Sequence, residues 1–416
     1  MNAATLETPR TLTNFFKLWA FFIPITSILL IPTVQGTLPS YLLAFSSLLL
    51  VLFVNQYKVQ LEGYLSELIM IIFVFILLSL ISQLLNSFFT IPAFDRITLV
   101  DPDNPSKVVF RTTFFTQSLY LLSGILTFVF VKRYFTLSWE KYIFLGINFF
   151  VIYGLFEFIY YLAFNDFGDF LTNREYDDHE TINLGNQLMT IGSVTFQRIN
   201  SLALEPSMFA FTLLPFWIYS IFTKRKKTSI LLFIGLCLST STSALVGIAF
   251  YFTSALKKSN KLLIFYLIGF SILFILLNYE FVFQLLDKIV LQKFNQQTES
   301  GIMRSYYFEN HLDYFFSLNF FSMIFGIGFG YVRSTDFFTT LLINNGFIGV
   351  IIFTVLFFVP IFKLKNTYKN FGLKLSLFVI YLIMMISVPE YSFLSIWLFL
   401  GIAYNQLNRQ KREAVL

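Results

Sequence analysis

Apolar runs of about 20 residues recur along this chain, and their recurrence limits the folds that it can adopt. A run of this length matches the hydrocarbon thickness of a bilayer. Of the 416 residues, 56% are hydrophobic, 12% are charged and 57 are phenylalanine. A soluble domain offers too little core to bury so much apolar surface. We therefore predict an all-α, polytopic integral membrane protein with a single membrane domain over residues 1–416.

The spacing of these runs predicts about 12 transmembrane helices. The two longest polar segments between them cover 164–202 and 279–337. The first run follows a polar segment and is long enough to span, so we expect a helix there rather than a cleaved signal peptide. The predicted spans are 16–33, 38–56, 66–86, 113–131, 142–163, 203–222, 228–240, 243–257, 262–278, 338–360, 373–388 and 391–406.

Lysines and arginines indicate the orientation of these spans, because cytoplasmic loops are enriched in them. With the N-terminus inside, 20 of the 29 basic residues fall on the cytoplasmic side, including the cluster at 224–227. We therefore expect cytoplasmic N- and C-termini, and two large external loops at 164–202 and 279–337. Both histidines, His179 and His311, lie in these loops. Because the basic residues are scattered between apolar runs, we expect no nucleic-acid partner.

Several kinds of chemistry are excluded by what the sequence lacks. The single cysteine, Cys237, cannot form an internal disulfide framework or a thiolate metal site. No P-loop pattern occurs, and the predicted cytoplasmic loops are too short for a nucleotide-binding domain. We therefore expect no cofactor, no metal and no use of ATP by this chain.

The first candidate motif lies where segment 164–202 meets the next apolar run. Pro206 suits the first turn of a helix, and Glu205 then falls at or next to the N-cap, where the helix dipole favours a negative charge. A capped helix with an interfacial arginine is one interpretation. The other is a site in which Arg198 binds an anion and Glu205 acts as a base. Because Glu is a less usual cap than Ser or Asp, the motif favours the site.

The second motif is in segment 279–337. If this part is helical, Arg304 and His311 are seven residues apart and share a face. A guanidinium group matches phosphate oxygens, and a histidine could take a proton from a sugar hydroxyl near neutral pH. A solvated amphipathic helix with a surface histidine is the alternative.

A third motif combines Gly326, Gly328 and Gly330 with Arg333 and Asp336. The spacing of the glycines is not that of a dinucleotide-binding fingerprint. The glycines favour a tight external turn that brings the two charged residues to the bilayer surface. A purely structural turn and a direct role in ligand binding both fit this pattern.

Two further features lie outside these motifs. Residues 281–294 alternate apolar and charged faces, as a helix lying in the membrane interface would, either as an anchor or beside a lipid entrance. Glu157 is the one acid that we place inside a span, where such a group is usually paired or functional.

The order of these features resembles the O-antigen polymerase and ligase superfamily, of the Wzy and WaaL type. The resemblance rests on an external loop that ends in an arginine, a Ser/Thr-rich hinge at 239–243 and a second large loop. That loop carries Ser300-Gly301 before Arg304 and the glycines of the third motif, and the next span contains a Gly-rich start at 341–349. The family architecture would cover most of the chain.

The resemblance implies a metal-independent, inverting glycosyltransferase without a cofactor. Its donor would be an undecaprenyl-diphosphate-linked glycan at the external face of the cytoplasmic (inner) membrane. By motif position, Arg198, Arg304 and Arg333 would bind the diphosphate. The candidate catalytic residues are Glu205, His311 and Asp336. The expected partners are this lipid-linked glycan, membrane lipids, a chain-length regulator and a flippase.

Departures from the family pattern favour a polymerase over a ligase. Where the ligases often carry His-Asn, this chain has Thr335-Asp336, and its hinge lacks the arginine found in many members. The paired Arg-x10-Gly pattern of some polymerases is also absent. The alternatives are an O-antigen ligase and a lipid-linked oligosaccharide flippase. A flippase would more often line a central path with ionisable residues, whereas here they crowd two loops.

Overall fold

The computed structural model describes residues 10–32, 34–53, 58–174, 187–191, 194–256 and 299–415. This part of the chain is mainly helical, as predicted. In chain order its elements are α1 (Arg10–Phe22), α2 (Pro39–Phe53), α3 (Lys58–Phe88), α4 (Thr112–Tyr134), η2 (Leu137–Trp139), α5 (Glu140–Phe164), β1 (Leu188–Ile191), β2 (Val194–Gln197), η3 (Ser201–Ala203), α6 (Pro206–Phe222), α7 (Lys226–Leu238), α8 (Thr242–Leu256), α12 (Glu299–Ser317), α13 (Phe320–Phe325), α14 (Phe337–Lys363), α15 (Tyr368–Ser387) and α16 (Leu394–Val415).

Within the described residues, five helical stretches are long and apolar enough to cross a membrane, where the sequence predicts about 12 spans. They are Leu61–Phe88, Thr112–Tyr134, Leu137–Phe164, Phe337–Lys363 and Tyr368–Ser387. Other predicted spans form shorter apolar helices, such as α2, α6 and α8. The predicted span 262–278 and the predicted interfacial helix 281–294 lie outside the described residues.

The predicted span 16–33 is wrong as a continuous helix. Helix α1 ends at Phe22, and Pro24 follows within two residues. Proline has no backbone N–H and disrupts a continuing helix. The chain beyond it bonds to the η3 region instead, where Thr26 N donates to Leu202 O at 2.9 Å.

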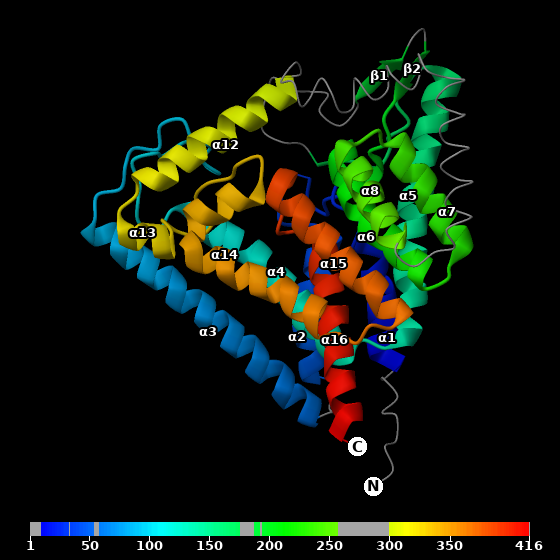
Figure 1. The fold of residues 1–416 in the computed structure, drawn as a ribbon, viewed down its shortest axis with the longest axis horizontal. Coiled ribbons are helices and arrows are strands. Elements are labelled where there is room, and N and C mark those ends of the chain that lie inside the picture. The colour runs from blue at the N-terminus through cyan, green and yellow to red at the C-terminus, as the bar shows by residue number, and fades with distance from the viewer. Residues whose placement is uncertain are drawn as a thin grey trace.

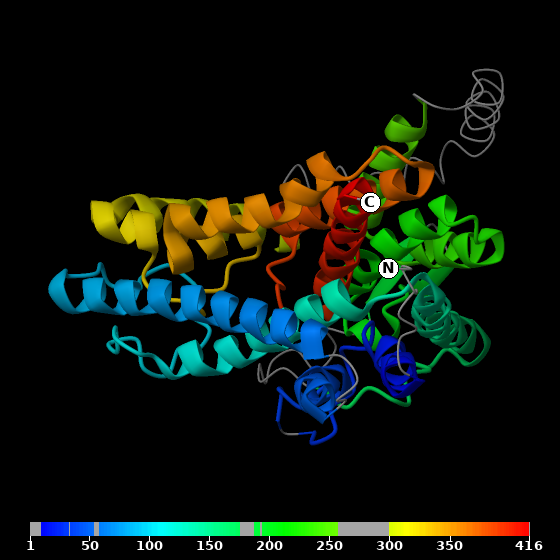
Figure 2. The ribbon, with the colours of Figure 1, turned by 90° about the horizontal axis from the view of Figure 1, so that it is seen from below.

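The helices form two groups joined through α15 and α16. Helices α3, α4 and α14 run side by side, while α1, α5, α6, α7 and α8 lie on the other side (Figures 1 and 2). Helix α16 packs along α4, and α15 packs against both α6 and α14. The last turns of α16 lie at one end of the molecule, and α12 lies across the other end, beyond the start of α14 (Figure 1).

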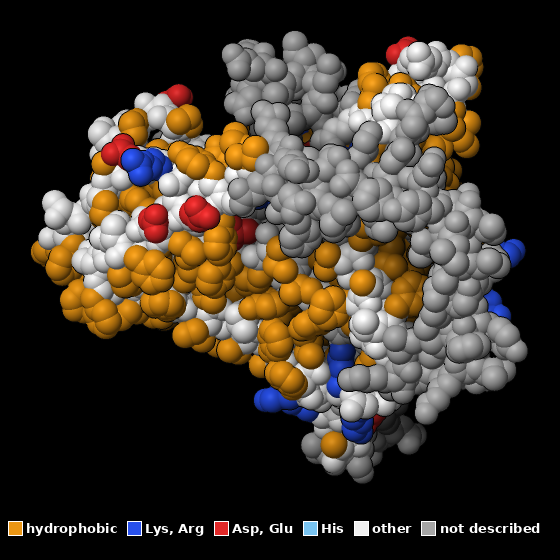
Figure 3. Space-filling model, turned by 45° about the horizontal axis from the view of Figure 1, so that its top comes forward, with side chains coloured by type: hydrophobic (Ala, Val, Ile, Leu, Met, Phe, Trp, Pro, Cys, Tyr) orange, Lys and Arg blue, Asp and Glu red, His pale blue; other side chains and the backbone are white. Residues whose placement is uncertain are grey.

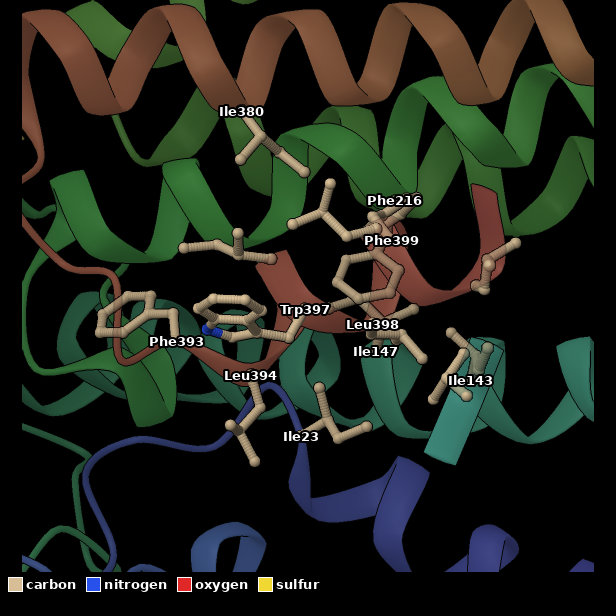
Figure 4. Packing of buried hydrophobic residues seen from close by; sticks show 14 of the residues in the cluster. Ile23, Ile143, Ile147, Phe216, Ile380, Phe393, Leu394, Trp397, Leu398 and Phe399 are labelled. Carbon is tan, nitrogen blue, oxygen red and sulfur yellow. The ribbon is translucent and has the colours of Figure 1, made fainter. Parts of the chain in front are cut away.

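Aromatic and branched side chains fill the centre, where α16 meets α4, α5 and α6. Figure 4 shows Trp397, Phe399 and Phe216 in this cluster. The indole of Trp397 lies over Gly124, where a Cβ atom would approach Nε1 to 2.3 Å. Small residues of this kind allow membrane helices to pack closely. The α4–α16 pair is therefore held at a distance that only glycine at this position permits.

Large apolar side chains also cover much of the outside. On α3, Ile69 and Phe73 are more than 60% exposed, an arrangement compatible with contact to lipid. On the face drawn in Figure 3, charged side chains gather toward the two ends and apolar side chains lie between them. One buried acid near an end, Glu67, is paired with Lys132 and with Arg133, the latter at 2.8 Å. The charge of Glu67 is therefore neutralised within the protein.

The three glycines of the third motif adopt the turn expected of them. Gly326, Gly328 and Gly330 all have positive φ angles. The turn returns to α14, because Ile327 N donates to Ile343 O at 2.9 Å. Opposite the turn, Gly346 breaks the regular geometry of α14 with a φ of 64°. The glycine turn and this kink therefore fit each other.

We predict that Gly346→Ala lowers the free energy of unfolding by at least about 1–2 kcal/mol, the cost of a left-handed conformation for a residue with a Cβ. The new Cβ atom would also lie 2.3 Å from Ile324 O. Thermal unfolding in detergent measures the loss. Gly36→Ala is the control, because its Cβ would meet Tyr120 only at 3.4 Å. Equal midpoints for the two variants would contradict this account of the kink.

Candidate functional site

A cavity of about 570 Å³ opens between α8, α12, α15 and the start of α14. From α12 it is lined by Gly301, Arg304, Ser305 and Phe308, which lie three or four residues apart and so form one helical face. Thr242 and Ser243 from the start of α8, Thr335 and Asp336 before α14, and Ser387 at the end of α15 complete its polar part. Apolar side chains of α15 line the remainder, including Leu382, Ile383 and Ile386.

Arg304 is the predicted arginine that lies directly in this cavity. The residue is exposed there, and its guanidinium group forms no hydrogen bond or ion pair within the part of the chain that the structure describes. Partial burial lowers the pKa of Arg304, and the nearby Glu205 carboxylate opposes this shift. An arginine remains protonated through the physiological range. Arg304 therefore presents a charged group with unused donors to the cavity.

Glu205 is the N-cap residue of α6 and Pro206 begins the helix, which confirms the placement predicted from sequence. The Glu205 side chain does not cap the helix; it accepts a hydrogen bond from Ser207 Oγ at 3.0 Å. Its carboxylate acts electrostatically on both Arg198 and Arg304. The structure therefore brings Glu205 and these two arginines into one electrostatic neighbourhood.

Arg198 is more enclosed than Arg304. Its Nε donates to Thr240 Oγ1 at 2.8 Å and to Ser239 O at 3.2 Å, and it also binds Gln187. Burial lowers the pKa of Arg198 to about 10, against the opposing effect of Glu205. Arg198 thus joins the end of β2 to the Ser/Thr-rich hinge between α7 and α8. Its donors serve mainly to hold this hinge in place.

The segment between Arg198 and Glu205 is held against α5. Ser201 and Leu204 have positive φ angles, which are unusual for residues with side chains. Glu157 accepts a hydrogen bond from Ser201 N at 3.0 Å, and Ser201 Oγ donates to Phe150 O at 2.6 Å. The partner of Glu157, which the sequence does not reveal, is therefore a backbone N–H group. These bonds fix the shape of the segment that carries both charged residues.

His311 lies on α12 but does not face the cavity. It is fully buried. Its Nδ1 lies 2.6 Å from Tyr307 O, which can only accept, and its Nε2 lies 3.3 Å from Thr98 N, which can only donate. These partners require the neutral tautomer with the proton on Nδ1. Because both ring nitrogens are occupied within the protein, this geometry does not support the predicted role of His311 as a base.

Asp336 and Arg333 are likewise engaged. Asp336 is the N-cap of α14: it accepts from Thr339 N at 2.7 Å, Thr339 Oγ1 at 2.8 Å and Ser334 Oγ at 3.2 Å. Arg333 forms an ion pair with Glu390. Asp336 borders the cavity as a helix cap, and the guanidinium group of Arg333 is paired with Glu390. Neither arrangement favours the direct roles predicted for them.

Glu309 is a cavity residue that the sequence reasoning missed. It is exposed and lines the cavity five residues after Arg304 on α12, about 7.5 Å further along the helix axis. Thr242 and Ser243 were noted only as parts of a hinge, yet they also line the cavity. Because Glu309 comes four residues after Ser305, a helical projection of 299–317 would place it beside Ser305 at the edge of the cavity face. His179 lies outside the described residues.

A change at His311 has a pH-dependent consequence. Burial lowers the pKa of His311 below its ordinary value of 6.5, so below that pH the unfolded chain binds more protons than the folded one and stability falls. In His311→Gln, which cannot be protonated, the thermal midpoint should fall less between pH 7 and pH 5 than in the wild type. If the thermal midpoints of both proteins fall equally between pH 7 and pH 5, burial of His311 does not cause the loss of stability.

The cap role of Asp336 predicts different effects for two substitutions. Asp336→Ala removes the acceptor of three hydrogen bonds and should cost about 1–2 kcal/mol of stability. Asp336→Asn keeps an acceptor for Thr339 N and should cost less. Chemical or thermal unfolding of the two purified variants compares them. A more stable Asp336→Ala protein would show that the cap is not stabilising.

Among the described residues, no group of three His, Cys, Asp or Glu side chains is arranged to hold a metal ion.

Comparison with known proteins gives no independent indication of the function of this chain. No family model, no curated protein and no solved structure matches this chain. The membrane character therefore rests on the apolar helices, and the chemistry of the site rests on the residues around the cavity.

Proposed function

We propose that this chain is a surface-polysaccharide polymerase of the O-antigen type. It would join undecaprenyl-diphosphate-linked oligosaccharide repeat units at the external face of the cytoplasmic membrane. The observation that carries this proposal is the cavity that Arg304 lines, where its guanidinium group has no hydrogen-bond or ion-pair partner among the described residues. An arginine in such a place suits the binding of a diphosphate, whose oxygens match the guanidinium donors.

The position of the cavity at one end of α15 supports the proposed orientation in the membrane. On α15, Lys369 lies near the first residue and pairs with Glu140 at 2.5 Å, while Ser387 at the other end lines the cavity. Eighteen residues of helix span about 27 Å, close to the thickness of the hydrocarbon core. Basic residues gather at the Lys369 end, which includes Arg225 and Arg409. With that end cytoplasmic, the cavity lies at the external surface.

The proposed reaction is an inverting displacement. The acceptor hydroxyl oxygen bonds to the anomeric carbon from one face, while the bond from that carbon to the diphosphate breaks on the other. Arg304 stabilises the negative charge that develops on the departing diphosphate. The N-terminus of α8, which carries Thr242 and Ser243 into the cavity, adds a partial positive charge.

A carboxylate must accept the proton of the acceptor hydroxyl. His311 has both nitrogens occupied, and Asp336 accepts three hydrogen bonds as a helix cap. Glu309 is exposed on the cavity wall. We therefore assign the base to Glu309, and leave Glu205 as a negative charge that acts electrostatically on the two arginines. This assignment replaces the three candidates that the sequence suggests.

Substitutions in the cavity test the proposal. Arg304→Ala should slow polymerisation about 100-fold or more, by analogy with the loss of one preorganised charge-stabilising donor. Glu309→Gln should slow it about 100-fold through loss of the base. Activity is measured as polymer formed from lipid-linked repeat units by the purified protein in nanodiscs. Lys107→Ala, at an exposed position in the segment before α4, is the matched control and should retain activity.

The same variants can be examined in cells that lack the native gene. A polymerase defect leaves single repeat units on an otherwise intact lipid anchor. Long chains retained on the lipid carrier would instead indicate a ligase. Near-normal chain length in Arg304→Ala, at an equal amount of membrane protein, would remove Arg304 from the site and with it the main support for the proposal.

A further inference from the structure

We propose that a second cavity, between α3, α4, α14 and α16, holds part of the isoprenoid chain of the acceptor lipid. This inference rests on the proposed function, because it assigns a place to the second of two lipid-linked substrates. The cavity has a volume of about 460 Å³. Its walls include Val74 and Phe75 from α3, Phe128 from α4, Ile352 and Phe353 from α14, and Trp397 from α16.

Three of the polar side chains around this second cavity are turned into the protein, and Asn345 is the other polar side chain in its wall. Tyr391 Oη donates to Gln117 Oε1 at 2.7 Å, Trp397 Nε1 to Tyr391 O at 2.8 Å and Tyr404 Oη to Leu356 O at 3.1 Å. The surface left to a ligand is therefore almost entirely hydrocarbon and aromatic. Such a wall offers a sugar or a phosphate nothing to replace its lost hydration. It suits a flexible apolar chain.

The second cavity is open along two helices that can cross the membrane. Val74 on α3 and Ile352 and Val355 on α14 line it, and each is more than 40% exposed. Both helices are long and apolar enough to span. A lipid chain could therefore enter sideways from the bilayer while its head group stays at the membrane surface. An aqueous ligand would have to cross this apolar rim.

The first residues of α14 separate the two cavities. Thr335 and Asp336 line the arginine cavity, whereas Phe337 and Leu341 line the second one. In an inverting displacement the acceptor approaches from the side opposite the leaving diphosphate. We place the donor diphosphate at Arg304 and the donor chain along the apolar α15 wall. The acceptor lipid then takes the opposite side of α14. The second cavity lies on that side.

Photochemical labelling tests this assignment in nanodiscs. The probes are a diazirine-bearing polyisoprenyl diphosphate and a diazirine-bearing phosphatidylethanolamine, and labelled peptides are identified by mass spectrometry. We expect the isoprenoid probe to label α3 and α14 at the second cavity several-fold more than the phospholipid probe does. Val74→Trp, which places a large side chain in the cavity, should reduce that labelling several-fold and raise the KM for acceptor with little change in kcat.

Leu77→Trp is the matched control, because Leu77 is exposed on the same helix but does not line the cavity. It should leave labelling and KM unchanged. Equal labelling by both probes, or equal effects of Val74→Trp and Leu77→Trp, would overturn the inference and show a groove filled by ordinary lipid. The two proposals can fail separately: absence of polymer from the wild-type protein would overturn the proposed function, whereas equal labelling by the two probes would overturn only the assignment of the second cavity.

Discussion

The need to pair every backbone polar group away from water governs this structure. Helices satisfy their own N–H and C=O groups, but a break in a helix exposes them. Here the breaks pair with one another. The chain after α1 bonds to the η3 segment, where Thr26 N meets Leu202 O, and Ile199 N bonds to Leu238 O at the end of α7. The glycine turn bonds to the kinked part of α14 through Ile327 N and Ile343 O. Irregular backbone is therefore stabilised by bonds between segments that lie far apart in the sequence.

Contacts between helix ends and helix breaks also form the candidate site. Arg198 donates to carbonyls of the α7–α8 hinge, so the break between these helices is both satisfied and fixed. The start of α8, the start of α14 and the end of α15 then meet around one cavity. At the opposite end, acids such as Glu140 are buried in contact with Lys369 and with Tyr219. Charges there are neutralised within the protein, whereas Arg304 has no hydrogen-bond or ion-pair partner among the described residues.

Much of the local structure could be predicted from the sequence, but few of the contacts between distant segments could. The helical class, the N-cap at Glu205 and the glycine turn follow from short-range rules, and the structure agrees with them. The continuous span at 16–33 was wrong because Pro24 outweighed the apolar run. Arg304 and His311 share a helical face, yet they lie two turns apart, and neighbours from other segments decide their surroundings. The bond from Thr98 N to His311 joins residues more than 200 positions apart, a contact that no spacing rule reveals.

The position of α14 between the two cavities has a consequence for how a polymer would grow. On the proposed assignment, each transfer leaves the lengthened chain on the lipid that sat beside Phe337, and leaves a bare carrier diphosphate beside Asp336. The product is then on the wrong side of the helix to serve as the next donor. It must leave one cavity and enter the other before another unit is added. Elongation would therefore proceed by repeated release and rebinding, and chain length would reflect how often a departing product returns before it diffuses away.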